Sequence, residues 1–220
     1  MWRIVPFLLA PVAMLAQPVP KSMLAIELDP ARRVLQVRNH YQSDAISIVV
    51  AHSNGNRYDS WKTWDAANCL EVAPLQHGDA RDITLGPPDW ESWDILAVVY
   101  ADGNVAGSRE VIQAVMQGHA MIASELEVAI HILNSDPDPA TAIDTWFDQL
   151  RKPSASSETV RRRAPGSLGI HPEPPLMTRL RVPRYVRTQL QNGVSRPEIV
   201  AALTAWRERL KTYQAGVVYL

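Results

Sequence analysis

The sequence has very little cysteine and, after its first twenty residues, no apolar run long enough to cross a membrane. Cys69 is the single cysteine among 220 residues, so no disulfide can form within the chain and its core depends on packing alone. The sequence also lacks a Gly-x-Ser-x-Gly elbow, a His-Glu-x-x-His motif, a Cys-x-x-Cys pair and a glycine-rich phosphate loop. The sequence therefore contains none of these motifs of hydrolases, zinc enzymes and nucleotide-binding proteins. We predict no cofactor and no metal.

A net charge of −1 conceals two parts of opposite sign. Residues 1–150 carry 9 basic and 19 acidic side chains, whereas residues 151–220 carry 13 basic and 4 acidic ones. The basic part can dock on the acidic part or bind an anionic partner such as lipid headgroups, a polyanionic glycan or nucleic acid. We favour docking within the chain or a solvated surface over a dedicated anion site, and retain Arg161, Arg162 and Arg163 as a possible anion-binding site.

The first twenty residues have the pattern of a secretory signal peptide. Arg3 precedes an apolar run from Ile4 to Ala16, and small and polar residues follow. The run is short for a membrane span, which needs about 20 apolar residues. We predict a signal peptide at residues 1–20 and a secreted or periplasmic protein without a stable transmembrane segment. An uncleaved membrane anchor is the alternative.

Alternating apolar residues predict half-buried strands after this segment. Leu35 and Val37 show the two-residue period, and so do Ile46, Ile48 and Val50. Further strands are expected at residues 81–85 and 94–101, with turns at 40–44 and 53–56. Several short strands at this spacing favour an immunoglobulin-like antiparallel β-sandwich over residues 21–106.

The apolar period then changes to that of amphipathic helices. An apolar stripe predicts a long helix over residues 109–133, and Asp138 with Pro139 is typical of the start of the next helix. Together they define a helical segment, residues 107–152, that we expect to pack on the sandwich. The stripe consists of Ile112, Val115, His119, Ile122, Leu126, Ile130 and Leu133.

The C-terminal region begins with an extended linker and ends in a helical hairpin. Residues 153–183 are rich in proline, serine and arginine, which is typical of a linker. Asn192 and Gly193 end one helix, and Ser195 with Glu198 forms a capping box that begins another. These signals predict a helical hairpin over residues 184–220. The fold class is therefore α+β, a sandwich followed by amphipathic helices and this hairpin.

Two resemblances accompany this organisation. Residues 190–200 resemble the entry to the helix-turn-helix of some bacterial response regulators, but the helix continues where a second turn and a recognition helix would follow, so we predict no nucleic-acid partner. The turn with Asp102, Gly103 and Gly107, between a strand and a long helix behind an export signal, resembles uncharacterised secreted bacterial proteins over residues 24–133. This second resemblance implies the architecture and no catalytic residue.

Aromatic pairs are the best candidate binding residues. Trp61 and Trp64, and likewise Trp90 and Trp93, lie three residues apart in polar, loop-like surroundings, with Asp65 among the neighbouring carboxylates. Indoles beside carboxylates can stack on sugars or anchor a protein partner. The alternative is that these tryptophans fill the ends of the sandwich as core residues.

Histidine and cysteine have simpler interpretations. We expect His119, which lies in the apolar stripe, to be a hydrogen-bonded core imidazole and not a metal ligand. Cys69 is a nucleophile only if a histidine lowers the pKa of its thiol, and is otherwise a small core residue. A loop site that combines His40, His52, His77 and Asp79 remains an alternative for metal binding.

These observations predict an exported, noncatalytic protein-interaction or structural module of the cell envelope, whose partner is an envelope protein or a glycan. The alternative function is a glycan- or small-ligand-binding module that uses Trp61, Trp64, Trp90 and Trp93. A hydrolase is the third possibility. The oligomeric state is not determined by the sequence.

Overall fold

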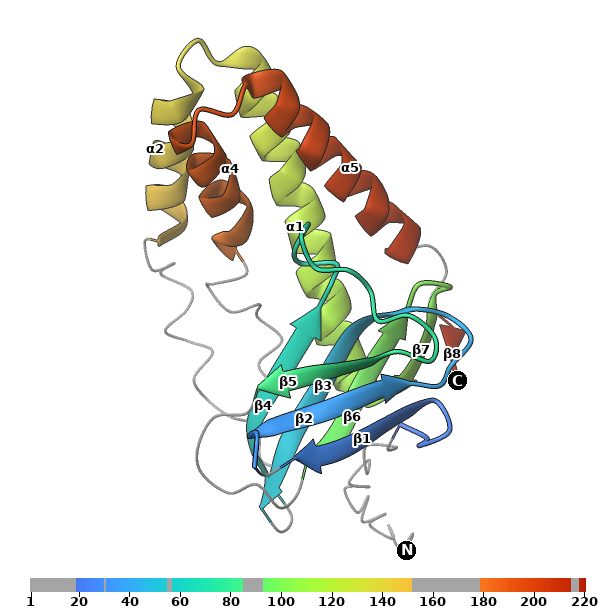
Figure 1. Ribbon diagram of the computed structural model, residues 1–220. Helices are drawn as coiled ribbons and strands as arrows, with labels where there is room; N and C mark the ends of the chain where they lie inside the picture. The colour runs from blue at the N-terminus through green and yellow to red at the C-terminus, as the bar shows by residue number, and fades with distance from the viewer. Residues whose placement is uncertain (1–18, 30, 55–56, 85–92, 152–178, 215–217) are drawn as a thin grey trace, which may run out of the picture.

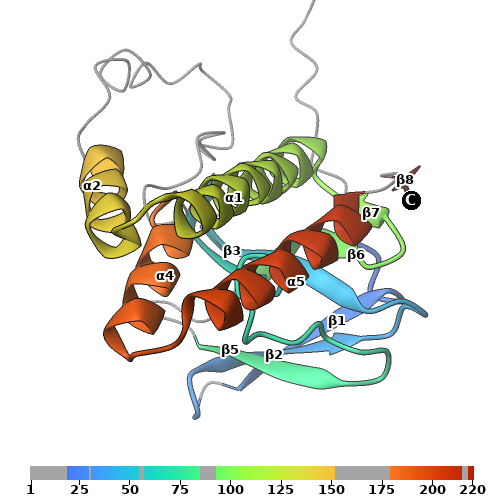
Figure 2. The ribbon, with the colours of Figure 1, turned by 90° about the horizontal axis from the view of Figure 1, so that it is seen from above.

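The chain folds into three layers, two β-sheets and a layer of helices. The computed structural model describes residues 19–29, 31–54, 57–84, 93–151, 179–214 and 218–220. A three-stranded sheet packs on one face of a five-stranded sheet, and the helices cover the other face (Figures 1 and 2). The α+β class is therefore confirmed. The predicted signal peptide lies almost wholly outside the described residues, and none of the described helices is both long and apolar enough for a membrane span.

The chain passes several times from one sheet to the other. The three-stranded sheet has the order β1-β2-β5 and is antiparallel. The five-stranded sheet has the order β4-β3-β6-β7-β8, in which only the β7–β8 pair is parallel. The strands span Leu24–Asp29 (β1), Val34–Asn39 (β2), Ala45–Asn54 (β3), Arg57–Asp65 (β4), Ala80–Thr84 (β5), Trp93–Tyr100 (β6), Asn104–Gly107 (β7) and Val218–Tyr219 (β8).

Strand β6 explains the unbroken apolar run in the sequence. It lies between β3 and β7 within the sheet, and the helices cover one of its faces while the three-stranded sheet covers the other. Leu96 and Val99 belong to the core beneath the helices, whereas Ile95, Val98 and Tyr100 belong to the core between the sheets. A strand buried on both faces loses the alternation of apolar and polar residues.

The helices begin and end close to their sequence signals. They span Arg109–Ser135 (α1), Pro139–Arg151 (α2), Arg181–Gln191 (α4) and Arg196–Gln214 (α5). Ser108 caps α1 by accepting a hydrogen bond from the Val111 amide, and Asp138 accepts one from the Thr141 amide at the start of α2. The predicted long helix is confirmed. Gly107, the last residue of β7 and two residues before α1, has φ +109°, and a Cβ there would overlap the Leu96 carbonyl, so only glycine fits this turn from strand to helix.

The C-terminal helices differ in two ways from expectation. Helix α4 begins at Arg181, so residues 181–183 belong to a helix and not to the predicted linker. The two helices are joined by the turn at Asn192 and Gly193, as predicted, but α4 packs on α2 and α1, and α5 packs mainly on α1 (Figure 1). Helix α5 therefore packs against α1 more than against α4, the helix that precedes it in the chain.

The capping box at the start of α5 is present with one difference. The Ser195 amide donates to a Glu198 carboxylate oxygen at 3.1 Å, as predicted. The Ser195 hydroxyl donates to the same oxygen at 2.6 Å instead of accepting from the helix backbone. Both hydrogen bonds stabilise the ionised carboxylate and lower the pKa of Glu198.

Candidate functional site

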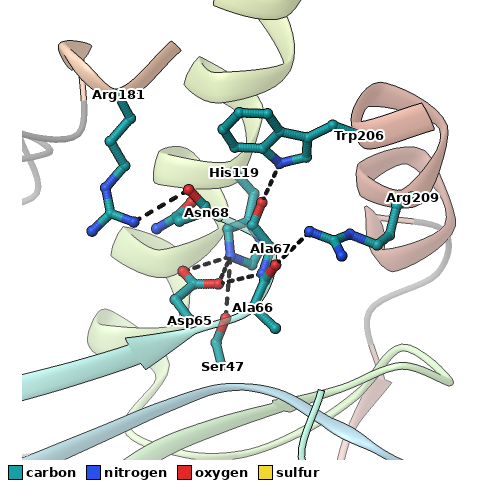
Figure 3. Close-up of polar contacts among 9 residues, drawn as sticks. All are labelled: Ser47, Asp65, Ala66, Ala67, Asn68, His119, Arg181, Trp206 and Arg209. Atoms are coloured by element: carbon teal, nitrogen blue, oxygen red, sulfur yellow. Dashed lines mark hydrogen bonds and ion pairs between the residues drawn. The ribbon is translucent and has the colours of Figure 1, made fainter. Parts of the chain in front are cut away.

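The most concentrated group of polar contacts lies where β4 ends beneath the helices. Asp65 is the last residue of β4, Ser47 comes from the neighbouring strand β3, and His119 comes from α1 (Figure 3). Ser47 is 1% exposed, and the side chains of His119 and Asp65 are 0% and 5% exposed. We call these three residues the buried polar cluster.

One nitrogen of the imidazole makes every hydrogen bond within the cluster. His119 Nε2 lies 3.0 Å from Asp65 Oδ2, 3.2 Å from Asp65 Oδ1 and 3.2 Å from Ser47 Oγ. Asp65 Oδ1 also accepts from the Ala67 amide at 2.9 Å. The other ring nitrogen, Nδ1, is buried and has no hydrogen-bond partner in the described part of the chain.

This geometry determines what the cluster can do chemically. A carboxylate only accepts hydrogen bonds, so His119 Nε2 must carry the hydrogen and donate it to Asp65. Ser47 therefore cannot give its proton to that nitrogen. In a serine-nucleophile relay the acid and the serine bond opposite nitrogens of the imidazole, whereas here they share one. The cluster holds β3, β4 and α1 together, and the prediction of His119 as a hydrogen-bonded core imidazole is confirmed.

The segment that follows Asp65 is held by side chains of the C-terminal helices. Residues 66–70, which we call the clasped segment, form no strand or helix, yet each of their five carbonyl oxygens accepts a hydrogen bond from α4 or α5. Trp206 Nε1 donates to the Ala67 carbonyl at 2.7 Å (Figure 3). Arg209 donates to the carbonyls of residues 66, 69 and 70 at 2.9, 2.8 and 3.3 Å, and Arg181 to that of residue 68 at 3.2 Å. The Ala67 carbonyl is buried and those of residues 66, 69 and 70 are partly buried, so the C-terminal helices supply the donors that these acceptors need.

Further arginines of the basic C-terminal region also contact the acidic part of the chain. Arg196 donates to the carbonyls of residues 136 and 137, Arg187 pairs with Asp144 at 3.0 Å, and Arg207 pairs with Glu127 at 3.5 Å. Of the two favoured alternatives, docking within the chain and a solvated surface, the described arginines show docking. Most of the groups that these C-terminal arginines bind are backbone carbonyls and not carboxylates.

The predicted aromatic site residues are placed as follows. Trp61 and Trp64 lie in strand β4 and Trp93 begins strand β6, so none of the three lies in a loop, which corrects the loop-like surroundings expected from the sequence. Trp64 and Trp93 are half-buried and pack against the core between the sheets. The Arg81 guanidinium lies 4.8 Å from the centre of the Trp64 ring. Asp65 belongs to the buried polar cluster on the helix side of the same sheet.

The remaining predicted site residues lie outside the described residues or in simple surroundings. Trp90 and Arg161, Arg162 and Arg163 fall in ranges that the structure does not describe. Cys69 is half-buried and not in a disulfide, and its backbone carbonyl accepts a hydrogen bond from Arg209. Within the described ranges, no three histidine, cysteine, aspartate or glutamate side chains lie close enough to hold a metal ion.

A buried carboxyl group in the helical layer escaped the sequence analysis. Glu125 on α1 is 7% exposed, and its Oε2 atom has no hydrogen-bond partner among the described residues. Burial raises the pKa of Glu125 to about 8, and the Arg179 guanidinium opposes this increase only in part. The side chain is therefore largely protonated at neutral pH.

The folded chain should consequently be less stable in mild base. Because the pKa of Glu125 is higher in the folded chain than its ordinary 4.5, its contribution is complete below pH 4.5 and is lost as the pH rises through about 8. We expect the free energy of unfolding to fall between pH 6 and pH 9 by an amount on the order of 3 kcal/mol from this group. Glu125→Gln, which mimics the protonated form, should remove most of that fall in urea titrations at the two pH values. Glu127→Gln, on the same helix but exposed, is the control and should retain it; an unchanged fall in Glu125→Gln would contradict the assignment.

Comparisons with protein-family models, curated proteins and solved structures found no match. The site therefore has to be interpreted from its own geometry.

Proposed function

We propose that this chain is an exported, noncatalytic protein-interaction module of the cell envelope, secreted or periplasmic, built on an immunoglobulin-like sandwich with a C-terminal helical hairpin. The polar groups of the buried polar cluster and the clasped segment are used to hold the layers together. This leaves the surface of the sheets and helices as the region available to a partner.

The observation that carries the proposal is the apolar edge of the five-stranded sheet. The described residues expose four large apolar side chains, and three of them are consecutive in and after strand β8. Val218, Tyr219 and Leu220 are 55%, 45% and 57% exposed, whereas the fourth, Val128 on α1, stands by itself at 40%. An exposed apolar edge strand is a template for pairing with another chain.

Two alternative functions have less support. Glycan or small-ligand binding would use the tryptophans, but Trp64 and Trp93 are half-buried against the core between the sheets, which favours their role as core residues. A hydrolase would need a nucleophile relay, and the buried polar cluster joins Ser47 and Asp65 to one nitrogen of His119. An anionic partner at Arg161, Arg162 and Arg163 remains a subsidiary proposal.

Photo-crosslinking in the living host tests the proposal. A benzophenone amino acid placed at position 219 should give recurrent adducts of defined mass when cells are irradiated. The same amino acid at position 128, an exposed apolar site on a helix, is the matched control and should give few. Adducts that are no more abundant at position 219 than at position 128 would contradict an interaction through this edge.

A further inference from the structure

The first residues that the structure describes already belong to the fold. Val19 is 6% exposed and lies in the core between the sheets, together with Leu24 at the start of β1. The Pro20 carbonyl accepts hydrogen bonds from the Met23 amide at 2.9 Å and from the Leu24 amide at 3.2 Å. These two hydrogen bonds close a turn that leads the chain from Val19 into β1.

This turn is also joined to a more distant part of the chain. The Met23 carbonyl accepts hydrogen bonds from the amides of His40 and Tyr41, at 2.9 and 3.1 Å, in the turn that follows β2. Whether a terminal segment can be removed depends on the burial of its side chains and on the hydrogen bonds of its backbone. By both criteria, the mature protein has to retain the residues from Val19 onward.

The sequence offers several bonds to a signal peptidase. Such an enzyme cuts after a small residue that follows the apolar run. The small residues among the first 25 positions are Ala10, Ala13, Ala16, Ser22 and Ala25. A cut after either of the first two would leave part of the apolar run on the product. A cut after Ser22 would remove Val19 from the core, and a cut after Ala25 would also remove the start of β1.

We propose that the signal peptide is cut at the bond between Ala16 and Gln17, two residues before Val19. The inference rests on the proposed function, because only an exported chain meets the signal peptidase of the host. Water adds across this peptide bond, which leaves a carboxylate on Ala16 and an amine on Gln17. The boundary lies at residue 16 and not at residue 20, because Val19 and Pro20 contribute a side chain and a carbonyl to the fold.

Peptide mapping of the natural product tests the position of the cut. The protein is purified from the periplasm or medium of its host and digested with a protease that cuts after glutamate. Its N-terminal peptide should cover residues 17–27, because Glu27 is the first glutamate of the chain. A peptide that begins at any other residue would overturn the proposed bond and retain export. An uncut chain in the cytosol would contradict both, whereas an uncut chain in the membrane fraction would overturn the cut alone.

Substitutions on both sides of the apolar run test which residue the peptidase reads. Ala16→Leu puts a large residue before the bond and should slow processing at least tenfold in a pulse-chase experiment. Ala10→Leu, the same change inside the apolar run, is the matched control and should be processed like the parent. Met14→Ala completes the Ala-x-Ala pattern and should be processed at least as fast. Equal processing of Ala16→Leu and Ala10→Leu would overturn the proposal.

Thermal unfolding of the mature protein tests the role of Val19 without reference to export. Val19→Ala should lower the melting temperature by about 4–8 °C, because it removes two buried methyl groups from the core between the sheets. Lys21→Ala changes an exposed residue of the same turn and should leave the melting temperature unchanged. An equal melting temperature for Val19→Ala and Lys21→Ala would remove the reason for excluding a cut after Ser22, and would overturn the inference.

Discussion

Trp206→Ala is expected to lower the free energy of unfolding by about 4 kcal/mol. The Trp206 side chain is 2% exposed in the core beneath the helices, so its removal leaves a large cavity. Its ring also packs edge-on against Tyr185, with centroids 6.0 Å apart. The truncation further leaves the Ala67 carbonyl, now bound at 2.7 Å, without its donor. Urea unfolding followed by circular dichroism measures the loss without depending on the indole fluorescence.

Trp206→Phe separates the two contributions. Phenylalanine keeps most of the apolar ring but has no N–H group, so the variant should lose about 1–3 kcal/mol, the cost of an unsatisfied buried acceptor. If Trp206→Ala lost less than about 1 kcal/mol, α5 would not be anchored on the clasped segment as the structure has it.

Asp65→Ala is expected to cost about 2–5 kcal/mol, because it leaves two buried hydrogen-bond donors without their acceptor. His119 Nε2 would lose both carboxylate oxygens, and the Ala67 amide would lose its acceptor at 2.9 Å. Asp65→Asn retains one oxygen acceptor and should lose roughly half as much. Thermal and urea unfolding of both variants, at a single pH, measure these differences.

Ser47→Ala is the matched control for the cluster. Ser47 shares Nε2 with Asp65, so its removal leaves the imidazole with its carboxylate partner and should cost no more than about 1 kcal/mol. A loss as large as that of Asp65→Ala would show that the hydroxyl is the main partner of His119, and would reopen the assignment of the hydrogen on Nε2.

Local signals predicted the helices well, because helix ends and amphipathic faces depend on residues close together in the chain. Ser195, Glu198 and Asp138 lie at the helix starts where their side chains can bind nearby backbone or carboxylate groups. The same holds for the apolar stripe of α1, since a period between three and four places its members on one face.

Strand β4 shows where local signals failed. The polar residues around Trp61 and Trp64 predicted loop-like surroundings, but β4 is paired with β3 along its length. Its polar positions are tolerated because β4 is an edge strand of the five-stranded sheet. Pairing partners distant in the sequence, and not the residues themselves, make this segment a strand. Strand β8 has the same explanation, since two residues form a strand only because β7 offers an edge.

The sequence by itself determined the α+β class, the extent of α1, the caps of α2 and α5 and the core location of His119, because each follows from a short-range pattern of apolar and capping residues. Only the tertiary structure decided that His119 binds Asp65 and Ser47, that Trp206 and Arg209 hold the clasped segment, and that the apolar strand β8 has no further strand beside it among the described residues. These contacts join residues 54 to 143 positions apart, or depend on what is left unpaired once the sheet is complete. Composition and periodicity carry no information about which distant donor meets which acceptor, whereas the closed fold fixes both.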